Sequence, residues 1–492
     1  MAIREGDIEY YSREEALASL SDFDPAYPEP VACSVLARPE SDHLLGYVSQ
    51  EAFTHVFPGD STKHPSARFF DDLSSELARS ATFHLWADVP LCRYRCNFCQ
   101  FPILVVSSRN GEVAAAAGRR WVDANIAEAG LWLEAVPALR ATPVGEFCLF
   151  GGTPTSIPAA ELGRLLDFYM DGFNFTSATS LRAEGSPDSL DRAAIASLHD
   201  MGFRTLTYGT QTFNDGLLAV ANRRHSGEQA ARAIAVAREL GFQRVDGDLV
   251  YGLPGQTVAG FLSDVERMIG LGFSTIVIIK LHLRPFKEVD YAVGHVSPAP
   301  WELPEVRSKL AARGYDWPSL GRQYQMREMA VARLVEAGYR EHPTTYFPHS
   351  SVGPERWRAL NLDQDKQYPQ VGIGLGAYTW STRSEATVTS DPHLYLRQVQ
   401  DGVIPLSEVS SISDAAREVR AVRMALSTCQ PLREETHRER FPGASLFTGQ
   451  WRRKFADLER RGLARVDAAA GTVTLTATGT TLVEAIINTE IG

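Results

Sequence analysis

The stretch 91–101, LCRYRCNFCQF, places Cys92, Cys96 and Cys99 in a CxxxCxxC pattern. Iron–sulfur clusters are held by cysteine thiolates, and three of them can hold a cube-shaped 4Fe–4S cluster by three of its four irons. The fourth iron then has no cysteine ligand in this run and can bind a small molecule. A zinc site is the simpler alternative, but structural zinc needs four ligands, and no second CxxC or paired histidine follows. The run therefore predicts an iron–sulfur cluster with one open position.

Composition narrows the class of protein. The chain has 492 residues, a net charge of −11, 44% hydrophobic and 22% charged residues, which is ordinary for a globular protein with more than one domain. An acidic chain does not resemble a nucleic-acid binder, and no apolar run approaches the roughly 18 residues of a membrane span. The polar N-terminus does not resemble a signal peptide, and three of the six cysteines share one motif. We expect a cytoplasmic protein without nucleic-acid or membrane partners.

The segment that contains the cysteines alternates between short apolar runs and helical patterns. The predicted strands are 83–87, 146–150, 180–183, 205–209, 244–250 and 275–279. The predicted helices between them are 119–136, 159–170, 190–201, 227–240 and 258–271. This alternation predicts a parallel sheet with helices outside, and six such units form a partial barrel. In such barrels the chemistry lies at the carboxyl ends of the strands.

The rest of the chain divides around this core. We expect an N-terminal extension at 1–80, the barrel core at 81–285, an extension at 286–404 and a C-terminal helical or winged-helix-like domain at 405–492. A Trp- and Pro-rich insertion, 285–318, begins the extension that follows the barrel core. This insertion either shapes a substrate pocket or only seals the barrel. The extension also includes a predicted helix at 324–337 and a Gly-rich strand or turn at 371–380.

The C-terminal domain carries a cluster of basic residues. A helix is predicted at 451–462 and a short strand at 472–476. The basic residues are Arg452, Arg453, Lys454, Arg460 and Arg461. A winged helix with such a face could bind DNA, but Asp457 and Glu459 interrupt the cluster. We therefore expect this domain to act as a lid over the active site.

Polar motifs follow the predicted strands in order. The second strand runs into GGTPT at 151–155, where glycines permit close backbone approach and a helix start offers N–H groups to a carboxylate. The third strand ends near Glu184, and the fourth in GTQTFN, followed by Arg223. The fifth continues into DLVYGLPGQT, which starts at Asp248. An arginine suits a carboxylate, and an aspartate suits an amino group or a ribose.

Together with CxxxCxxC, this ordered set resembles the radical S-adenosylmethionine (SAM) enzymes, and within them the family named for oxygen-independent coproporphyrinogen III oxidase, called HemN-like. The resemblance implies a partial (β/α)6 TIM-type radical SAM barrel with a 4Fe–4S cluster and two SAM molecules. Cys92, Cys96 and Cys99 would hold the cluster. The residues expected at the cluster-bound SAM are Gly151 and Glu184, and Trp86 is expected to contact a cofactor. Those expected at the second SAM are Gly152, Thr153, Gln211, Arg223 and Asp248.

The sequence also departs from the coproporphyrinogen oxidases. Those enzymes carry a fourth cysteine two residues after the third, where this chain has Phe101. They carry a tyrosine and a histidine before the cluster, where this chain has Trp86 and Asp88. The CxF ending also occurs in the heme chaperones and the methylating members of the family. The long N-terminal extension and the insertion favour the methylating members, often called class C radical SAM methyltransferases.

The expected reaction transfers a SAM-derived methylene or methyl group to an sp² carbon of an aromatic or polyunsaturated secondary metabolite. The product would be C-methylated or cyclopropanated, as in the biosynthesis of duocarmycin-type antibiotics. A reductant such as flavodoxin or ferredoxin is expected, and the need for a partner methyltransferase is left open. The alternatives are a non-catalytic heme-binding chaperone and an oxygen-independent coproporphyrinogen III oxidase. Tyr208, His282 and His349 remain open as candidates for a general base.

Overall fold

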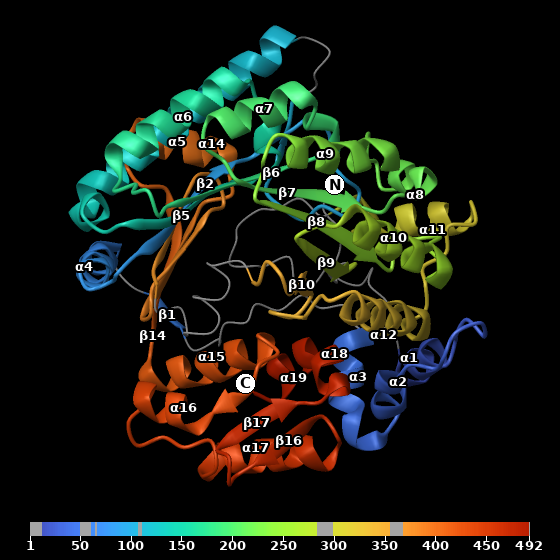
Figure 1. The fold of residues 1–492 in the computed structure, drawn as a ribbon. Coiled ribbons are helices and arrows are strands. Elements are labelled where there is room, and N and C mark those ends of the chain that lie inside the picture. Colours follow the sequence, from blue (N-terminus) through green and yellow to red (C-terminus); the bar gives the residue numbers. More distant parts are fainter. Residues whose placement is uncertain are drawn as a thin grey trace.

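A curved, mainly parallel sheet forms the centre of the molecule (Figure 1). The computed structural model describes residues 12–49, 61–63, 66–106, 111–282, 299–354 and 368–491. The six parallel core strands are β2 (Phe83–Val89), β5 (Val144–Gly151), β6 (Ser180–Gly185), β7 (Thr205–Gln211), β8 (Arg244–Tyr251) and β9 (Thr275–Lys280). All six predicted strands are confirmed, and each continues for one or two residues beyond its predicted carboxyl end.

Helices cover the outer face of these strands (Figure 1). They are α5 (Gly111–Ala135), α6 (Ala159–Gly172), α7 (Arg192–Asp200), α9 (Gly227–Glu239) and α10 (Val258–Leu271). Each packs through an apolar stripe, such as Leu162, Leu165 and Leu166 on α6, which are all buried. The predicted helices and the partial (β/α)6 barrel are therefore confirmed.

The sheet extends beyond the barrel on both sides. The stretch 371–380 forms two strands with a turn between them. It begins the series β11 (Gln370–Ile373), β12 (Tyr378–Trp380), β13 (Ser384–Val388), β14 (Leu406–Ile412) and β1 (Ser61–Lys63). Strand β11 is parallel to β2, and the later pairs are antiparallel. On the other side, β10 (Tyr346–Pro348) pairs antiparallel with β9. The first barrel strand is thus an interior strand with neighbours on both sides.

The C-terminal region has the helix and strand order of a winged helix. Its elements are α15 (Asp414–Ser427), β15 (Leu432–Arg433), α16 (Glu434–Arg440), α17 (Gly449–Arg460), β16 (Ala464–Asp467), β17 (Thr472–Leu475), α18 (Ala477–Thr481) and α19 (Val483–Thr489). The three strands form a separate antiparallel sheet in the order β15-β17-β16. The helix and the strand predicted in this region are both present.

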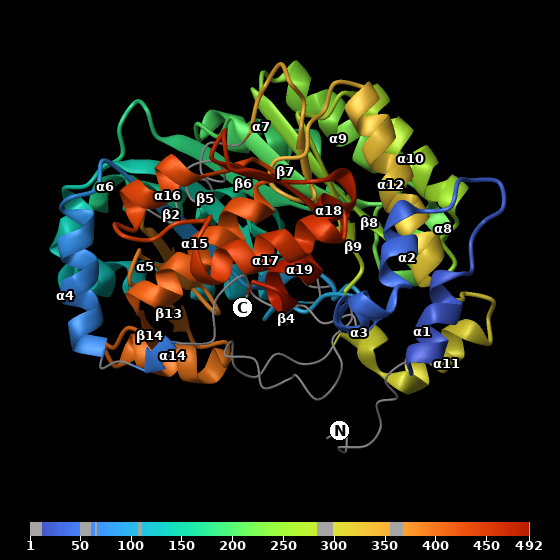
Figure 2. The same cartoon turned by 90° about the horizontal axis from the view of Figure 1, so that it is seen from below.

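This C-terminal region lies on the open side of the curved sheet, next to the N-terminal helices (Figures 1 and 2). Those helices are α1 (Arg13–Leu20), α2 (Val31–Leu36) and α3 (Asp42–Ser49). Leu36 and Leu44 share a hydrophobic core with Trp451 and Ile486. The two ends of the chain therefore form one packed unit.

The remaining elements connect these parts. They are α4 (Ser66–Leu77), β3 (Leu91–Cys92), β4 (Leu104–Val105), α8 (Asp215–Val220), α11 (Pro304–Ala311), α12 (Leu320–Glu336) and α14 (Pro392–Gln400), with short 3-10 turns at Pro39–Ser41, Pro137–Arg140, Pro154–Ser156, Pro187–Ser189 and Pro300–Glu302. Helix α12 confirms the helix predicted at 324–337. Within the described part of the chain, no helix combines the length and apolar character needed to cross a membrane.

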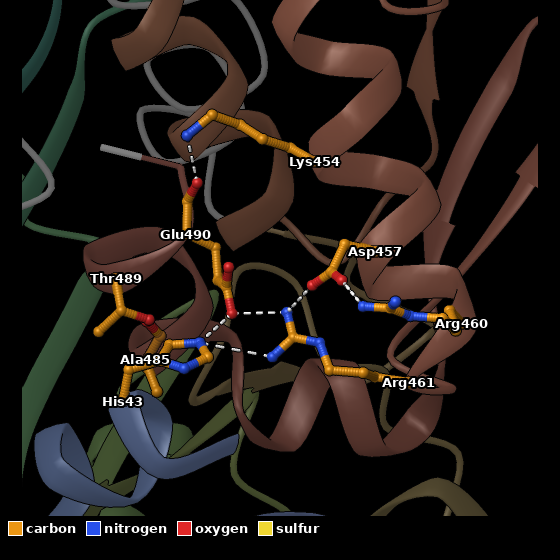
Figure 3. Close-up of polar contacts among 8 residues, drawn as sticks. All are labelled: His43, Lys454, Asp457, Arg460, Arg461, Ala485, Thr489 and Glu490. Carbon is orange, nitrogen blue, oxygen red and sulfur yellow. Dashed lines mark hydrogen bonds and ion pairs between the residues drawn. The ribbon is translucent and has the colours of Figure 1, made fainter. Parts of the chain in front are cut away.

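Much of the predicted basic cluster is engaged inside this unit (Figure 3). Arg461 is buried, and its guanidinium contacts the carboxylates of Asp457 and Glu490. Lys454 donates to the backbone carbonyl of Glu490, and His43 of α3 contacts the Glu490 carboxylate. These groups tie the end of the chain to α17 and α3, so they do not form one free cationic face.

Candidate iron–sulfur and cofactor site

The three motif cysteines lie in the loop that follows β2. The Cys92 Sγ is 3.3 Å from the Thr153 Oγ1, and the backbone N–H of Cys99 donates to the Cys96 carbonyl at 3.1 Å. Arg223 donates to the Cys96 Sγ at 3.3 Å. The described residues contain no group of three or more His, Cys, Asp or Glu side chains placed to hold a single metal ion. A cube-shaped cluster makes a different demand, because each cysteine would bind a different iron.

The thiols of this loop are held in an environment that disfavours their charge. Burial raises the pKa of Cys92 to about 12 and that of Cys99 to about 11, and the Cys96 thiol adds to both shifts. Arg223 acts in the opposite direction at both sites. Ligand thiols must lose their protons to bind metal, so cluster binding here would release protons. These thiols fit an iron–sulfur cluster, because the positive charge of bound iron would stabilise their thiolate forms.

The GGTPT loop packs directly on the cysteine loop. A Cβ at Gly152 would lie 3.0 Å from the Cys92 Sγ and 2.8 Å from the Leu91 carbonyl oxygen. The Gly152 N–H donates to Val89 at 2.9 Å, and the Thr153 N–H donates to Leu91 at 2.8 Å. Only glycine fits at such an approach. The structure therefore brings the predicted SAM loop into contact with the predicted cluster loop.

Glu184 lies at the carboxyl end of β6 and faces the barrel interior. Its carboxylate accepts a hydrogen bond from Arg182 at 3.0 Å, and Arg182 also lies 3.4 Å from the Glu146 carboxylate. The Arg182 guanidinium is 5.8 Å from the Trp86 ring centre. Arg182 and Glu146 are almost fully buried, whereas 28% of the Glu184 side chain is exposed to solvent. Two of the predicted cofactor-binding residues, Trp86 and Glu184, thus flank one arginine.

Two of the residues predicted at the second SAM, Gln211 and Asp248, lie on β7 and β8. Gln211 ends β7 in a left-handed conformation with φ of +67°, and Asp248 lies on β8 opposite Gly209. Both Gln211 and Asp248 line a cavity described below, but Arg223 is not among its lining residues. Arg223 donates to the Gly209 carbonyl at 2.6 Å and to the Ser186 Oγ at 2.9 Å. The structure places the Arg223 guanidinium against the cysteine loop, where it contacts the Cys96 Sγ.

A cavity of about 690 Å³ opens beside the cluster loop. Its walls include Cys99 and Phe101 of that loop, Asp248 and Lys280 from the ends of β8 and β9, and the C-terminal residues 481–485. Tyr47 of α3, Arg327 of α12 and Glu484 of α19 also line it. The sequence analysis missed these last three residues, because no local motif marks them.

The three candidate bases lie in different places. Tyr208 is buried on the outer side of β7 and donates to the Ala230 carbonyl at 2.9 Å. His349 bonds to Ser351, 2.7 Å away, and does not line the cavity. His282 lines the cavity, 3.8 Å from Glu484, and burial lowers the pKa of its imidazole. Of the three, His282 is therefore the one placed to move a proton in the cavity.

The described part of the insertion supports the cysteine loop from outside. The backbone N–H of Trp301 donates to the Asn97 carbonyl at 3.0 Å, and the centre of the buried Trp301 ring lies 6.0 Å from that of the Phe98 ring. Gln100 donates to Glu302 at 2.7 Å. Through these contacts the described part of the insertion packs against the cysteine loop. Residues 285–298 lie outside the described residues.

Comparison with known proteins defines the class first. Residues 88–268 match the family model described as the Radical SAM superfamily. This region holds the cysteine loop, the GGTPT loop and the core strands β5 to β8. That family implies a 4Fe–4S cluster and SAM.

Similarity to individual proteins then points to the HemN/HemW-like group. The chain is 26% identical over 307 residues to "Heme chaperone HemW" of Bacillus subtilis (strain 168), which covers 62% of this chain and 72% of the relative. It is 25% identical over 378 residues to "Oxygen-independent coproporphyrinogen III oxidase" of Helicobacter pylori (strain ATCC 700392 / 26695), covering 72% and 76%. The solved structure of coproporphyrinogen III oxidase (HemN) from Escherichia coli matches with a TM-score of 0.70 at 21% identity, over 85% of this chain and 92% of that one. The fold expected from the sequence is thereby confirmed.

Proposed function

We propose that this chain is a radical SAM enzyme that transfers a SAM-derived methylene or methyl group to an sp² carbon of an aromatic or unsaturated small molecule. The product would be C-methylated or cyclopropanated. The observation that supports this proposal is the cavity of about 690 Å³, which adjoins Cys99 and includes Gln211 and Asp248 in its wall. A second SAM and a substrate would meet there, next to the cluster loop.

The chain's own residues would bind and orient the reactants. Cys92, Cys96 and Cys99 would hold the cluster, which when bound and reduced supplies the electron that splits SAM into methionine and a 5′-deoxyadenosyl radical. Gln211 and Asp248 would hold the second SAM within reach of that radical. Proximity and orientation of this kind can lower an activation barrier by roughly 7–11 kcal/mol. Residues 481–485 line the cavity, and we propose that they keep water from the reactive species.

The lining of the cavity supports the proposed substrate class. Phe101, Tyr251, Tyr324 and Tyr346 supply aromatic surface, and Lys280 supplies a cation. Ligand pockets of this kind combine apolar walls with a few polar groups that fix orientation. An aromatic or polyunsaturated metabolite with a polar end suits these walls. An external one-electron donor such as flavodoxin or ferredoxin is part of the proposal, and so is an optional partner methyltransferase.

A second candidate comes from the named relatives. Heme chaperone HemW and oxygen-independent coproporphyrinogen III oxidase are the curated proteins that match over 62% and 72% of this chain. These names favour a heme-handling chaperone or a porphyrinogen oxidase over a methyltransferase. The position of a fourth cysteine is occupied by Phe101, whose side chain is exposed and lines the cavity. This departure from the oxidases leaves the chaperone as the stronger alternative.

One experiment separates these candidates. Reconstituted, oxygen-free protein is given a reductant and SAM deuterated on its methyl group, and the 5′-deoxyadenosine is analysed by mass spectrometry. Deuterium in that product would show attack on a second SAM and support methylene transfer. Unlabelled 5′-deoxyadenosine would count against it and would be followed by an assay with coproporphyrinogen III. No 5′-deoxyadenosine, together with heme binding seen as a Soret band, would establish the chaperone.

A further inference from the structure

A buried arginine lies in the wall of the cavity that adjoins the cysteine loop. Arg327 of α12 lines this cavity together with Lys280 of β9, and only 4% of the Arg327 side chain is exposed. Its Nη2 donates to the Glu341 carboxylate, whereas its Nη1 is buried and has no hydrogen-bond partner among the residues that the structure describes. Buried polar groups are ordinarily hydrogen-bonded. The Nη1 group is therefore a donor that a molecule bound in the cavity would satisfy.

Glu341 holds this arginine in its charged form. Besides the guanidinium, the Glu341 Oε1 accepts the backbone N–H of Thr345 at 2.9 Å and lies 3.4 Å from the Thr344 hydroxyl. Against the effect of burial, Glu341 and Tyr251 keep the pKa of Arg327 above its ordinary value. Arg327 is therefore a charged donor whose position is fixed by one carboxylate.

The segment that this carboxylate holds lies beside the end of β9. Thr344 and Thr345 both line the cavity, and the Thr345 carbonyl accepts the N–H of Ile278 at 2.9 Å, two positions before Lys280. Thr345 has φ of +71°, which a β-branched residue rarely adopts, and strain of this kind concentrates at ligand sites. The guanidinium, the Lys280 ammonium and the two threonine hydroxyls thus form one donor-rich surface, which we call the Arg327 wall.

The charges at the Arg327 wall favour an anion. Arg327 and Lys280 carry two positive charges against the single carboxylate of Glu341, and Lys280 donates to the Val48 carbonyl at 3.5 Å. Two acids line the same cavity. Asp248 is the residue proposed to hold the second SAM, and the Glu484 carboxylate lies 3.8 Å from the His282 imidazole. A ligand that complements the Arg327 wall therefore brings a negative charge and hydrogen-bond acceptors.

We propose that Arg327 and Lys280 bind a carboxylate of the substrate at this wall. The inference rests on the proposed function in taking this cavity as the substrate site, and it narrows the substrate to an aromatic or unsaturated carboxylic acid. A carboxylate offers two acceptor oxygens, and its hydrogen bonds to charged donors are short and strong. The apolar part of such a molecule would lie against Tyr251, Tyr324 and Phe101, which line the same cavity.

The test measures the binding of two aromatic probes, 2-naphthoate and the uncharged 2-naphthamide. Each is titrated by calorimetry into cluster-reconstituted, oxygen-free protein, with and without SAM and without a reductant, so that no turnover occurs. Wild type should bind 2-naphthoate at least about tenfold more tightly than 2-naphthamide. The double variant Arg327→Met, Glu341→Gln removes both charges of the buried pair. In this variant and in Lys280→Met, the preference should fall to about threefold or less.

The matched control is Arg322→Met, at an exposed position of the same helix, which should keep the full preference. A general structural defect would weaken the binding of both probes alike, so the ratio of the two affinities reports the carboxylate contact. If the double variant does not fold, the wild type and Lys280→Met still give this ratio.

The outcomes separate this inference from the proposed function. Equal or undetectable binding of the two probes by the wild type would overturn the carboxylate site, and so would an unchanged ratio in the variants of Arg327 and Lys280. Binding of 2-naphthoate that is lost when SAM is present would overturn it too, because the wall would then hold the carboxylate of SAM. Absence of deuterium transfer with the ratio intact would refute methyl transfer and leave the carboxylate site standing.

Discussion

The Arg223 guanidinium donates a hydrogen bond to the Cys96 Sγ at 3.3 Å, across 127 positions of sequence. The same side chain bonds to the Gly209 carbonyl near the end of β7 and to the Ser186 hydroxyl directly after β6. The Cys96 sulfur, Tyr94 and Asp188 keep the pKa of Arg223 above its ordinary value against the effect of burial. One partly buried cation thereby joins the cysteine loop to the barrel and would offset charge on a predicted cluster ligand.

Removal of Arg223 and removal of Asp248 should differ in their effects. Arg223→Ala leaves the Cys96 sulfur without its cation, so we expect poor cluster retention and loss of SAM cleavage. Asp248→Ala alters only the cavity wall, so the cluster should stay, with product formation reduced about tenfold or more relative to SAM cleavage. Iron and sulfide analysis and the ratio of product to 5′-deoxyadenosine measure both effects. Equal cluster content in the two variants would contradict this division.

Cys96→Ala should abolish the cluster and all SAM cleavage. Each cysteine is expected to hold one iron, and no other described cysteine lies in the loop to replace it. The matched control is Cys429→Ala, which removes a partly buried cysteine outside the loop. The visible absorption of the reconstituted protein and the yield of 5′-deoxyadenosine are measured. Retained cleavage in Cys96→Ala would refute the cluster assignment.

Gly152→Ala should damage the site through packing alone. The added methyl would lie 3.0 Å from the Cys92 Sγ and 2.8 Å from the Leu91 carbonyl oxygen. Overpacking of this kind typically costs about 1–3 kcal/mol. The control is Gly46→Ala in α3, where nothing lies within 4 Å and the helix should gain up to about 1 kcal/mol. Thermal melting and cluster content report both changes, and intact cluster binding in Gly152→Ala would disprove the close contact.

The cluster-free protein should lose stability as the pH rises above about 9. Burial raises the pKa of Cys92 to about 12 and that of Cys99 to about 11, so the folded state retains protons that the unfolded state releases. Their contribution is complete below the unfolded value and is lost as the pH rises through the folded values. Cys92→Ser should show a shallower decline in the free energy of unfolding between pH 9 and 11, measured in urea. Parallel curves would show that the thiol is not shielded.

The contacts of Arg461 and His43 with Glu490 form a seam between the two ends of the chain, and this seam should control access to the cavity. Arg461→Ala would leave the carboxylates of Asp457 and Glu490 without their buried partner (Figure 3), which commonly costs about 3–5 kcal/mol. Hydrogen exchange in 481–485, which line the cavity, should become faster. Arg452→Ala, at an exposed position of the same helix, should leave it unchanged. Unchanged exchange in both variants would show that the seam does not hold residues 481–485 in place.

The sequence by itself determined the parts that depend on local patterns. Six strands and five helices follow from apolar periodicity, and the cysteine loop follows from spacing along 11 residues. It could not place Arg223, whose contact with Cys96 depends on how the fourth unit returns to the first. Nor could it show that Asp88, visible as a departure from the family, is buried against Gly151 and Gly374.

Only the tertiary structure decided which residues form the walls of the cavity and which residues meet in the seam between the two ends of the chain. Tyr47, Arg327 and Glu484 meet in one cavity, and His43 contacts Glu490 across 447 positions. No periodicity or motif encodes such encounters, because they arise from packing between faces that are remote in the chain. Short-range patterns set which residues can bind a cluster and SAM, whereas long-range packing sets what surrounds them and how closely they are enclosed.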